Sequence, residues 1–488
     1  LLQASRTSPD GADPEDLLLL GWIAPAGGAI PLLQAFHPHE WTPVSPSRQY
    51  LGYGLRLAGH QPGTPLFNPA DLFANALPTD RFLGVAPVPP DTLLHQVKAW
   101  IFTPESLRSA ADTRLKIEIN GSTAFPDEWD LITRRIYTDS SRVVLTPLSG
   151  GYSATTLRAD SFDHDGRRTI PTVLKISSRK NTDSEVRAYH DHVKKFILNN
   201  STVIMGNAVQ GPWAGLRYNF VGVNGPGSTL AWLADHYVRR PAAEVLPLFD
   251  TVFGQVLWPW YGQPKPETMR PYAQHDPSPL FPGIPEQAEK ILGISADDPV
   301  LPCPELERDL PNTFCFLRHE YPRRVSREYP WLSTITHGDL NLNNILIDEK
   351  ENIYVIDFSE TRPRNVLSDF ARIEPVITLQ MTRLETPGDM RDLLRFMEGL
   401  ASVSPLKGDP PFCYSGSDPM VEKAWQTVCL LRRYARKAVA GNDQPAFYWL
   451  PLLEWTLPSV YFVQLSPERK RLWMFAAALL CEQLQKQP

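Results

Sequence analysis

One stretch of the sequence constrains the fold more than the rest of the chain does. Residues 337–346 spell HGDLNLNNIL, and the tripeptide IDF at residues 356–358 places Asp357 thirteen residues after Asn344. Apolar residues flank a polar turn between the two motifs, which is typical of a short β-hairpin. The spacing therefore predicts that a hairpin holds Asp339 and Asn344 close to Asp357.

These three side chains suit the transfer of a phosphoryl group from a nucleotide. Asp339 lies on a polar loop, where its carboxylate could accept the proton of an attacking hydroxyl. Asn344 offers an amide oxygen and Asp357 a rigidly held carboxylate, and Mg²⁺ takes a few such ligands beside water and phosphates. The HGD tripeptide alone fits an ordinary loop, but the full pattern favours one base and two metal ligands.

A candidate phosphate-binding loop and a candidate lysine precede this motif. Glycines between two predicted strands would let backbone N–H groups approach phosphate oxygens. The predicted nucleotide-binding residues of this loop are Ser149, Gly150, Gly151 and Ser153. Lys175 lies in the next predicted strand, 172–176, and Glu185 lies on a helix predicted from about Thr182, where it could pair with Lys175. Each feature alone also fits a hairpin turn or a solvated strand face.

Taken in order, the motifs resemble the kinase-like phosphotransferases of the aminoglycoside phosphotransferase and choline kinase branch, over roughly residues 140–488. The resemblance implies an α+β, bilobal protein-kinase-like fold, with a β-rich N-lobe, a helical C-lobe and ATP or GTP held with Mg²⁺ between them. It makes Asp339 the catalytic base and His337 the brace of the catalytic loop. It makes Asn344 and Asp357 the Mg²⁺ ligands. It also places the interlobe hinge at the strand 215–221, so that backbone groups near Phe220 and Val221 would bind the adenine edge of the nucleotide.

The string IDFSETRPRNVLSDFARIE resembles, more loosely, the kinase-like module of bacterial multidomain signalling or conflict proteins called ternary complex associated domains. In the kinase branch, the segment around Asp369 caps a helix and braces the catalytic loop. Only eleven residues separate Asp357 from Asp369, and no Ala-Pro-Glu follows. This leaves no room for a long activation segment, so a small-molecule or unusual hydroxyl acceptor is favoured over a peptide.

The chain departs from the kinase pattern beside the predicted base. Asn341 stands where relatives often carry His, Gln or Lys, so a cation facing the γ-phosphate is missing, and Ser359 follows Asp357-Phe358 instead of Gly. Arg362 and Arg364 could reach a phosphate or an acidic acceptor, or form surface salt bridges. Three arginine pairs are predicted to lie on solvated faces: Arg134-Arg135, Arg239-Arg240 and Arg432-Arg433.

Composition and segment texture predict the organisation of the chain. Hydrophobic residues make up 42% of the 488 residues and the net charge is -6, so a disordered chain is excluded and no nucleic-acid partner is expected. The predicted parts are an extra N-terminal α/β region of unknown role (1–139), a kinase-like N-lobe (140–225) and a helical C-lobe (226–488). A Pro-rich surface insertion is predicted at 274–312.

The cysteines and the apolar runs indicate a cytoplasmic protein. Five widely spaced cysteines fit free thiols in a reducing compartment better than disulfides or a zinc site. Glycines and prolines interrupt the uncharged run 17–36, and acidic residues precede it, so neither a membrane span nor a signal peptide is expected. The chain does not begin with Met, so a piece of a longer protein is expected, in which residues 1–139 could dock a protein partner.

Three functions remain open at this point. The first is a nucleotide-dependent phosphotransferase acting on a hydroxyl. The second is a nucleotide-binding pseudokinase or regulatory module, which the departure at Asn341 favours. The third is nucleotidyl transfer on the same fold.

Overall fold

The computed structural model describes residues 114–121, 125–148, 155–197, 199–219 and 230–487. These form two compact units, each of which is described by itself. The first takes the described residues of Leu1–Asp183 and Val203–Phe220, and the second those of Ser184–Thr202 and Val221–Pro488.

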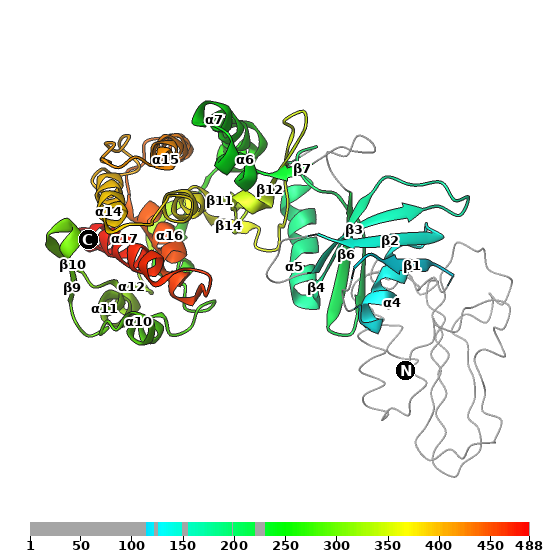
Figure 1. Ribbon diagram of the computed structural model, residues 1–488, viewed down its shortest axis with the longest axis horizontal. Coiled ribbons are helices and arrows are strands. Elements are labelled where there is room, and N and C mark those ends of the chain that lie inside the picture. The colour runs from blue at the N-terminus through cyan, green and yellow to red at the C-terminus, as the bar shows by residue number, and fades with distance from the viewer. Residues whose placement is uncertain (1–113, 122–124, 149–154, 198, 220–229, 488) are drawn as a thin grey trace, which may run out of the picture. The chain divides into compact units, whose positions relative to one another are not determined.

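A six-stranded sheet forms most of the first unit, in the order β1-β2-β3-β4-β6-β5 (Figure 1). Its strands are β1 (Lys116–Ile119), β2 (Arg142–Pro147), β3 (Thr155–Phe162), β4 (Thr172–Ser178), β5 (Ile204–Gln210) and β6 (Trp213–Asn219). β1 runs parallel to β2, with helix α4 (Asp127–Ile136) between them in the chain, and the other neighbours are antiparallel. The sheet therefore extends to a strand, β1, on the N-terminal side of residue 140.

Helix α4 covers one face of this sheet. Its buried residues Ile132 and Ile136 join a core that includes Leu145 and Leu174. A Cβ added at Gly215 of β6 would overlap the side chain of Ile132. A glycine at this position therefore allows the helix to approach the strand closely.

The helix predicted from about Thr182 begins earlier, because α5 comprises Arg179–Ala188. The hydroxyl of Ser178 accepts a hydrogen bond from the backbone N–H of Asn181 at 3.3 Å, as an N-cap side chain does. Thr182 is buried and its hydroxyl pairs with that of Ser177 at 2.9 Å. Thr182 therefore contributes to the packing of the helix, and Ser178 contributes to its start.

Two three-stranded sheets and a hairpin belong to the second unit. The first sheet has the order β13-β12-β7, with β7 (Leu230–Trp232), β12 (Ile345–Asp348) and β13 (Ile353–Val355). The second has the order β14-β11-β8, with β8 (Lys265–Met269), β11 (Tyr329–Thr336) and β14 (Arg362–Asn365). The hairpin pairs β9 (Val300–Cys303) with β10 (Arg308–Pro311). β12 and β13 are the two arms of the hairpin predicted between the HGD and IDF motifs.

Helices make up the rest of the second unit. They are α6 (Leu233–Arg239), α7 (Ala242–Thr251), α8 (Trp258–Tyr261), α9 (Pro271–Gln274), α10 (Ile284–Leu292), α11 (Thr313–Cys315), α12 (Tyr321–Arg324), α13 (Ser368–Pro375), α14 (Pro387–Ala401), α15 (Pro419–Ala438), α16 (Ala446–Thr456) and α17 (Pro467–Gln485). Side-chain caps start the long ones: Thr386 for α14, Asp418 for α15 and Ser466 for α17. A β-rich first unit and a helix-rich second unit confirm the predicted α+β class.

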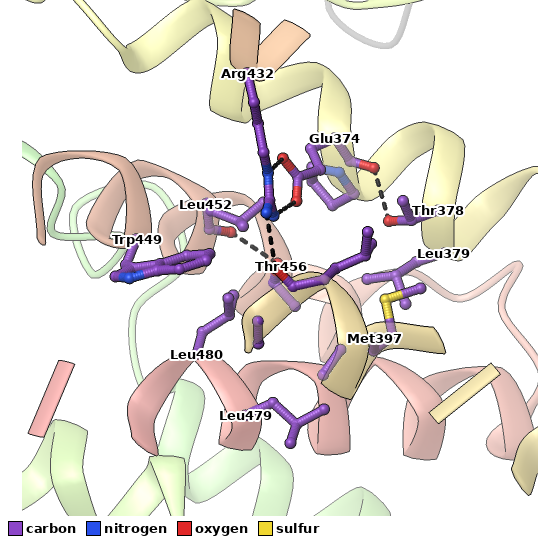
Figure 2. A pocket seen from close by; sticks show the side chains of 14 residues that line it. Glu374, Thr378, Leu379, Met397, Arg432, Trp449, Leu452, Thr456, Leu479 and Leu480 are labelled. Atoms are coloured by element: carbon purple, nitrogen blue, oxygen red, sulfur yellow. Dashed lines mark hydrogen bonds and ion pairs between the residues drawn. The ribbon is translucent and has the colours of Figure 1, made fainter. Parts of the chain in front are cut away.

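A buried ion pair lies in the core between α13, α15 and α16. The guanidinium of Arg432 approaches the carboxylate of Glu374 at 2.6 Å (Figure 2). The hydroxyl of Tyr448 donates to the same carboxylate at 2.7 Å. The two charged groups line a cavity of about 30 Å³, room for about two water molecules. The predicted solvated face is wrong for Arg432, which is fully buried, and fits Arg433, whose side chain is 65% exposed.

The Pro-rich stretch 274–312 is folded and partly buried, which the prediction of a surface insertion did not anticipate. It contains α10 and the β9–β10 hairpin, and buries Leu301 and Leu310. Arg308 donates to Glu398 of α14 and to Glu482 of α17, which attaches the hairpin to the helical core. No described helix is long and apolar enough to cross a membrane, and the run 17–36 lies outside the described residues.

Candidate active site

Asp339 lies on the loop that follows β11, and a buried carboxylate fixes the start of this loop. The backbone N–H groups of His337 and Gly338 donate to Asp369 of α13 at 2.7 and 3.0 Å. The hydroxyl of Tyr261 donates to the same carboxylate at 2.7 Å. Burial and the neighbouring Asp369 charge raise the pKa of Tyr261 well above its ordinary value, so the phenol keeps its proton and donates.

These contacts confirm the predicted brace at Asp369 and correct its other predicted role. Asp369 does not cap α13: the N-cap residue is Leu367, without a side-chain hydrogen bond. The carboxylate instead satisfies two backbone donors on another segment of the chain. A charge-assisted hydrogen bond of this kind is stronger than a neutral one, so the loop has a well-defined backbone course before any substrate binds.

Gly338 has the backbone conformation that the turn before Asp339 requires. Its φ is +85°, in the left-handed region that glycine enters at little cost. A Cβ at this position would also overlap the backbone carbonyl of Glu360. The middle residue of the HGD motif is therefore a glycine for two separate steric reasons.

His337 connects the loop that carries Asp339 to the strand that leads to Asp357. Its Nε2–H donates to the carbonyl of Ile356 at 2.9 Å, and its own carbonyl accepts from the Thr361 hydroxyl at 3.1 Å. The side chain is fully buried and stacks at a tilt against Phe358, with ring centroids 5.4 Å apart. This geometry suits the predicted brace and keeps the imidazole away from solvent.

Two asparagine amides hold the backbone of the predicted base. The Nδ2 groups of Asn341 and Asn344 donate to the carbonyl of Asp339 at 3.2 and 2.8 Å. The Asn341 side chain also caps the short turn Leu342–Asn344 by accepting from the N–H of Asn343 at 2.9 Å. The departure from the kinase pattern at Asn341 therefore has a structural role in this loop.

Asn344 and Asp357 are brought together by the hairpin between them. The N–H of Ile356 donates to the backbone carbonyl of Asn344 at 3.0 Å, which places the two motifs side by side. The Nδ2 of Asn344 is used by Asp339, which leaves the Oδ1 of the same amide for a cation. An amide oxygen is a ligand that hard cations prefer. Asp357 adds a carboxylate, whose Oδ1 accepts from the hydroxyl of Ser359 at 3.1 Å.

The backbone at Asp357 has an uncommon conformation. Its φ is +64°, in the left-handed region, where Asp is tolerated better than bulkier residues. A residue held in such a region costs of order 1–3 kcal/mol of folding free energy, and such residues cluster at functional sites.

Among the described residues no group of three or more His, Cys, Asp or Glu could hold a metal. One amide oxygen and one carboxylate fit Mg²⁺, which takes its remaining ligands from water and phosphates.

The turn of the hairpin depends on Asp348. Its carboxylate accepts from the N–H groups of Lys350 and Asn352 at 2.9 and 2.8 Å, from the Asn352 amide at 2.8 Å and from the Tyr354 hydroxyl at 3.2 Å. Burial alone would raise the pKa of Asp348, but these hydrogen bonds outweigh it and lower the pKa. The turn that sets the distance between Asn344 and Asp357 therefore contains a charged acceptor.

Arg372 contacts the predicted base, and the sequence analysis missed it. Its Nε and Nη2 donate to Oδ1 of Asp339 at 3.3 and 3.0 Å. Its guanidinium lies 3.8 Å above the ring of Trp455 on α16. A signal existed in the sequence, because Arg372 follows Asp369 by three residues and shares its helix face.

The predicted nucleotide-binding residues lie elsewhere in the chain. Ser149, Gly150, Gly151, Ser153, Phe220 and Val221 lie outside the described residues. Lys175 is in β4 of the first unit, where it pairs with Thr156 of β3 and Leu216 of β6. Glu185 is buried on α5, in the second unit. Their predicted ion pair stays a prediction.

Solved structures of several small-molecule kinases are similar to this chain. A thermostable mutant of the aminoglycoside phosphotransferase APH(4)-Ia, in ternary complex with ADP and hygromycin B, is 13% identical, with a TM-score of 0.38, covering 70% of this chain and 96% of that chain. Choline kinase LicA from Streptococcus pneumoniae is 10% identical, with a TM-score of 0.34, covering 70% and 94%. Plasmodium vivax ethanolamine kinase is 14% identical, with a TM-score of 0.31, covering 70% and 81%.

A family model identifies the protein family of this chain. No curated protein matches it significantly. The family described as Ternary complex associated domain 9 matches residues 140–295 and 305–453, which together are more than half of the 488 residues. The chain therefore belongs to the ternary complex associated domain 9 family, as the looser of the two predicted resemblances indicated.

Proposed function

We propose that this chain transfers the γ-phosphoryl group of ATP or GTP, with Mg²⁺, to a hydroxyl of a small-molecule or unusual acceptor. One observation carries the proposal. A braced loop and a hairpin bring together a half-exposed carboxylate at Asp339, an amide oxygen at Asn344 and a second carboxylate at Asp357. These are the groups that phosphoryl transfer needs from a protein, which are a base and oxygen ligands for the metal.

Each group has a distinct part in the proposed reaction. Asp339 accepts the proton of the acceptor hydroxyl as that oxygen attacks the γ-phosphorus. Asn344 and Asp357 would hold Mg²⁺, which neutralises charge on the phosphate oxygens when bound. Asp369 and His337 act through the loop, because they fix its backbone and do not face the reacting atoms. Lys175 and the loop 149–153 are proposed to position the phosphates, with Glu185 as the partner of Lys175.

Two matched variants test the proposal. Asp339→Asn keeps the size of the side chain but removes the base, so transfer should fall by about 10²–10⁴-fold while nucleotide binding persists. Asp357→Ala should abolish the Mg²⁺-dependent rise in melting temperature that ATP or GTP produces. Turnover that survives Asp339→Asn would contradict the proposed base. No melting shift with either nucleotide in the wild-type chain would contradict nucleotide binding itself.

The ion pair between Arg372 and Asp339 favours one alternative function. At 3.0 Å the guanidinium neutralises the carboxylate that would serve as base, as a regulatory nucleotide-binding module without transfer activity would tolerate. Mg²⁺-dependent nucleotide binding without release of ADP, across a broad set of hydroxyl acceptors, would favour this pseudokinase function. Mass analysis of any product separates phosphoryl transfer from nucleotidyl transfer, since the nucleotidyl group is much heavier.

A further inference from the structure

Arg372 uses only part of its hydrogen-bonding capacity on Asp339. Both of its contacts go to one oxygen, Oδ1, while a guanidinium has five N–H donors in a fixed fork. Within the part of the chain that the structure describes, Nη1 of Arg372 and Oδ2 of Asp339 have no hydrogen-bond partner. A hydroxyl that gives its proton to Oδ2 would therefore lie beside a guanidinium with donors to spare.

The ring of Trp455 holds this guanidinium in place. The Arg372 side chain is 16% exposed and its guanidinium carbon lies 3.8 Å from the centre of the Trp455 ring, a contact that restricts the movement of the guanidinium. A fixed, partly dry guanidinium is a strong binding group for carboxylates and phosphates, because little side-chain freedom is lost on binding.

The two helices that contribute Arg372 and Trp455 offer no unpaired carboxylate to a cationic acceptor. Helices α13 and α16 contain three acidic residues in all. Asp369 accepts the backbone donors of the catalytic loop, and Glu374 is paired with Arg432. Glu454 accepts from His275 at 2.7 Å. Each carboxylate of α13 and α16 therefore already has a hydrogen-bond or ion-pair partner within the protein.

Further positive charge follows Asp357 along the chain. Arg362 is 60% exposed at its side chain and approaches Glu360 only at 3.9 Å. Arg364 is largely buried, its Nη2 lies 3.7 Å from the same Glu360 carboxylate, and its Nε has no hydrogen-bond partner among the described residues. Burial is the main cause that lowers the pKa of Arg362, and the charge of Arg364 is the second, so the two guanidinium groups repel each other. The Glu360 carboxylate approaches both guanidinium groups and offsets part of that repulsion, and a second anion at this end of β14 would offset more of it.

We propose that the acceptor carries an anionic group, a phosphate or a carboxylate, beside the hydroxyl that is phosphorylated, and that Arg372 binds this group. The inference rests on the proposed function and adds the charge class of its substrate. In the reaction the acceptor oxygen bonds to the γ-phosphorus, the bond from that phosphorus to the β–γ bridging oxygen breaks, and the hydroxyl proton goes to Asp339. The nucleoside diphosphate leaves.

The charge preference has a simple electrostatic origin. A cationic group beside the hydroxyl would meet the guanidinium at close range with no carboxylate of α13 or α16 free to compensate, and like charges in a partly dry site repel strongly. A neutral acceptor lacks both the repulsion and the attraction. The expected order of specificity is therefore anionic, then neutral, then cationic.

The test compares acceptors that differ in charge on one frame. The full chain with Mg²⁺ and γ-labelled ATP is given glucose 6-phosphate, glucose or glucosamine, and then glycerol 3-phosphate, glycerol or 2-amino-1,3-propanediol. We expect kcat/KM to be at least about tenfold higher for the anionic member of a frame than for the neutral one. Arg372→Gln should bring this ratio to about one, and Arg372→Lys should keep part of it.

Arg471→Gln is the matched control, because Arg471 is a half-exposed arginine of α17 paired with Glu305 at 3.1 Å. It should leave the ratio unchanged. Should no acceptor of the panel be phosphorylated, calorimetric titration of the Mg²⁺–AMP-PNP-loaded chain with inorganic phosphate decides. Binding of phosphate that Arg372→Gln removes supports the proposal, and absence of such binding overturns it.

The failure of this inference differs from that of the proposed function. Asp339-dependent transfer to glucose or glucosamine in preference to glucose 6-phosphate would overturn the anionic acceptor and keep the phosphotransferase. A charge preference that survives Arg372→Gln would likewise overturn the assignment to Arg372. A chain that does not bind Mg²⁺–AMP-PNP would contradict the proposed function itself.

Discussion

The carboxylate of Glu374 and the guanidinium of Arg432 meet at 2.6 Å in the helical core, with both side chains almost wholly buried. Glu374 lies one and a half turns after Asp369 on the same helix, α13. One end of this helix is thus anchored by a buried ion pair, while the other holds the backbone of the loop that carries Asp339. The position of Asp339 depends on contacts far from any substrate.

Removing one partner of this pair should destabilise the second unit strongly. Arg432→Met leaves Glu374 buried without its counter-charge, which costs about 3–5 kcal/mol of unfolding free energy. The double variant Glu374→Gln, Arg432→Met should lose less than Arg432→Met alone, because no charge is then left unpaired. Urea unfolding of the four chains of this cycle measures the coupling. Arg433→Met, which breaks an exposed pair with Asp409, is the control and should cost about 1 kcal/mol or less.

Asp369→Asn should loosen the catalytic loop. The amide has a single acceptor oxygen and presents its NH₂ to a backbone N–H, so one of the donors at His337 and Gly338 is left unsatisfied. We expect a loss of about 2–3 kcal/mol in unfolding free energy and a fall in transfer rate. Tyr261→Phe removes only the phenol donor to the same carboxylate and should cost about 1 kcal/mol. Equal losses in the two variants would show that the backbone contacts contribute nothing.

Gly338→Ala should be far more harmful than an alanine at another left-handed glycine. The new methyl group makes the existing left-handed backbone cost about 1–2 kcal/mol and also overlaps the Glu360 carbonyl, so the loop must shift. Gly441→Ala has the same sign of φ, at +84°, but its Cβ would meet no atom within 4 Å. Thermal unfolding and transfer rates of the two variants separate the cost of backbone conformation from the cost of the overlap.

Asp348 predicts a pH dependence of stability. Because its pKa is lower in the folded chain than in the unfolded one, its contribution is fully present above about pH 4, the ordinary value of the carboxyl, and is lost as pH falls through the folded value. Asp348→Asn should therefore cost about 1–2 kcal/mol at pH 7 and much less near pH 2. Asp298→Asn, at an exposed aspartate, is the control. A difference between wild type and Asp348→Asn that stays constant from pH 7 to pH 2 would contradict the charged acceptor.

Much of the site could be predicted from sequence because its parts are close in the chain. The two polar motifs are separated by one hairpin, and strong apolar runs mark both arms, so Asn344 and Asp357 had to meet. Asp369 follows Asp357 by twelve residues, which limits how far the brace can lie from the loop. Local patterns of this kind survive without any knowledge of tertiary packing.

Contacts between distant segments could not be predicted in the same way. Trp455 contacts Arg372 although more than eighty residues separate them in the chain, and the hydrophobic periodicity of neither helix predicts this contact. The arginine pair at residues 432 and 433 predicts a solvated face, because arginine rarely lies in a core without a partner. The position of Arg432 four residues after the buried Val428, on an otherwise apolar helix face, was the signal that it needed a partner.

The hydrogen bonds that Asp369 accepts from two successive backbone N–H groups also affect substrate affinity. Residues 337–339 have a fixed course without any ligand, so their conformational entropy is lost during folding and not during binding. A substrate that meets an ordered loop keeps more of its contact energy as affinity and associates without waiting for the loop to form. Weakening these two hydrogen bonds would then raise KM and slow association, even where the chemistry at Asp339 is unchanged.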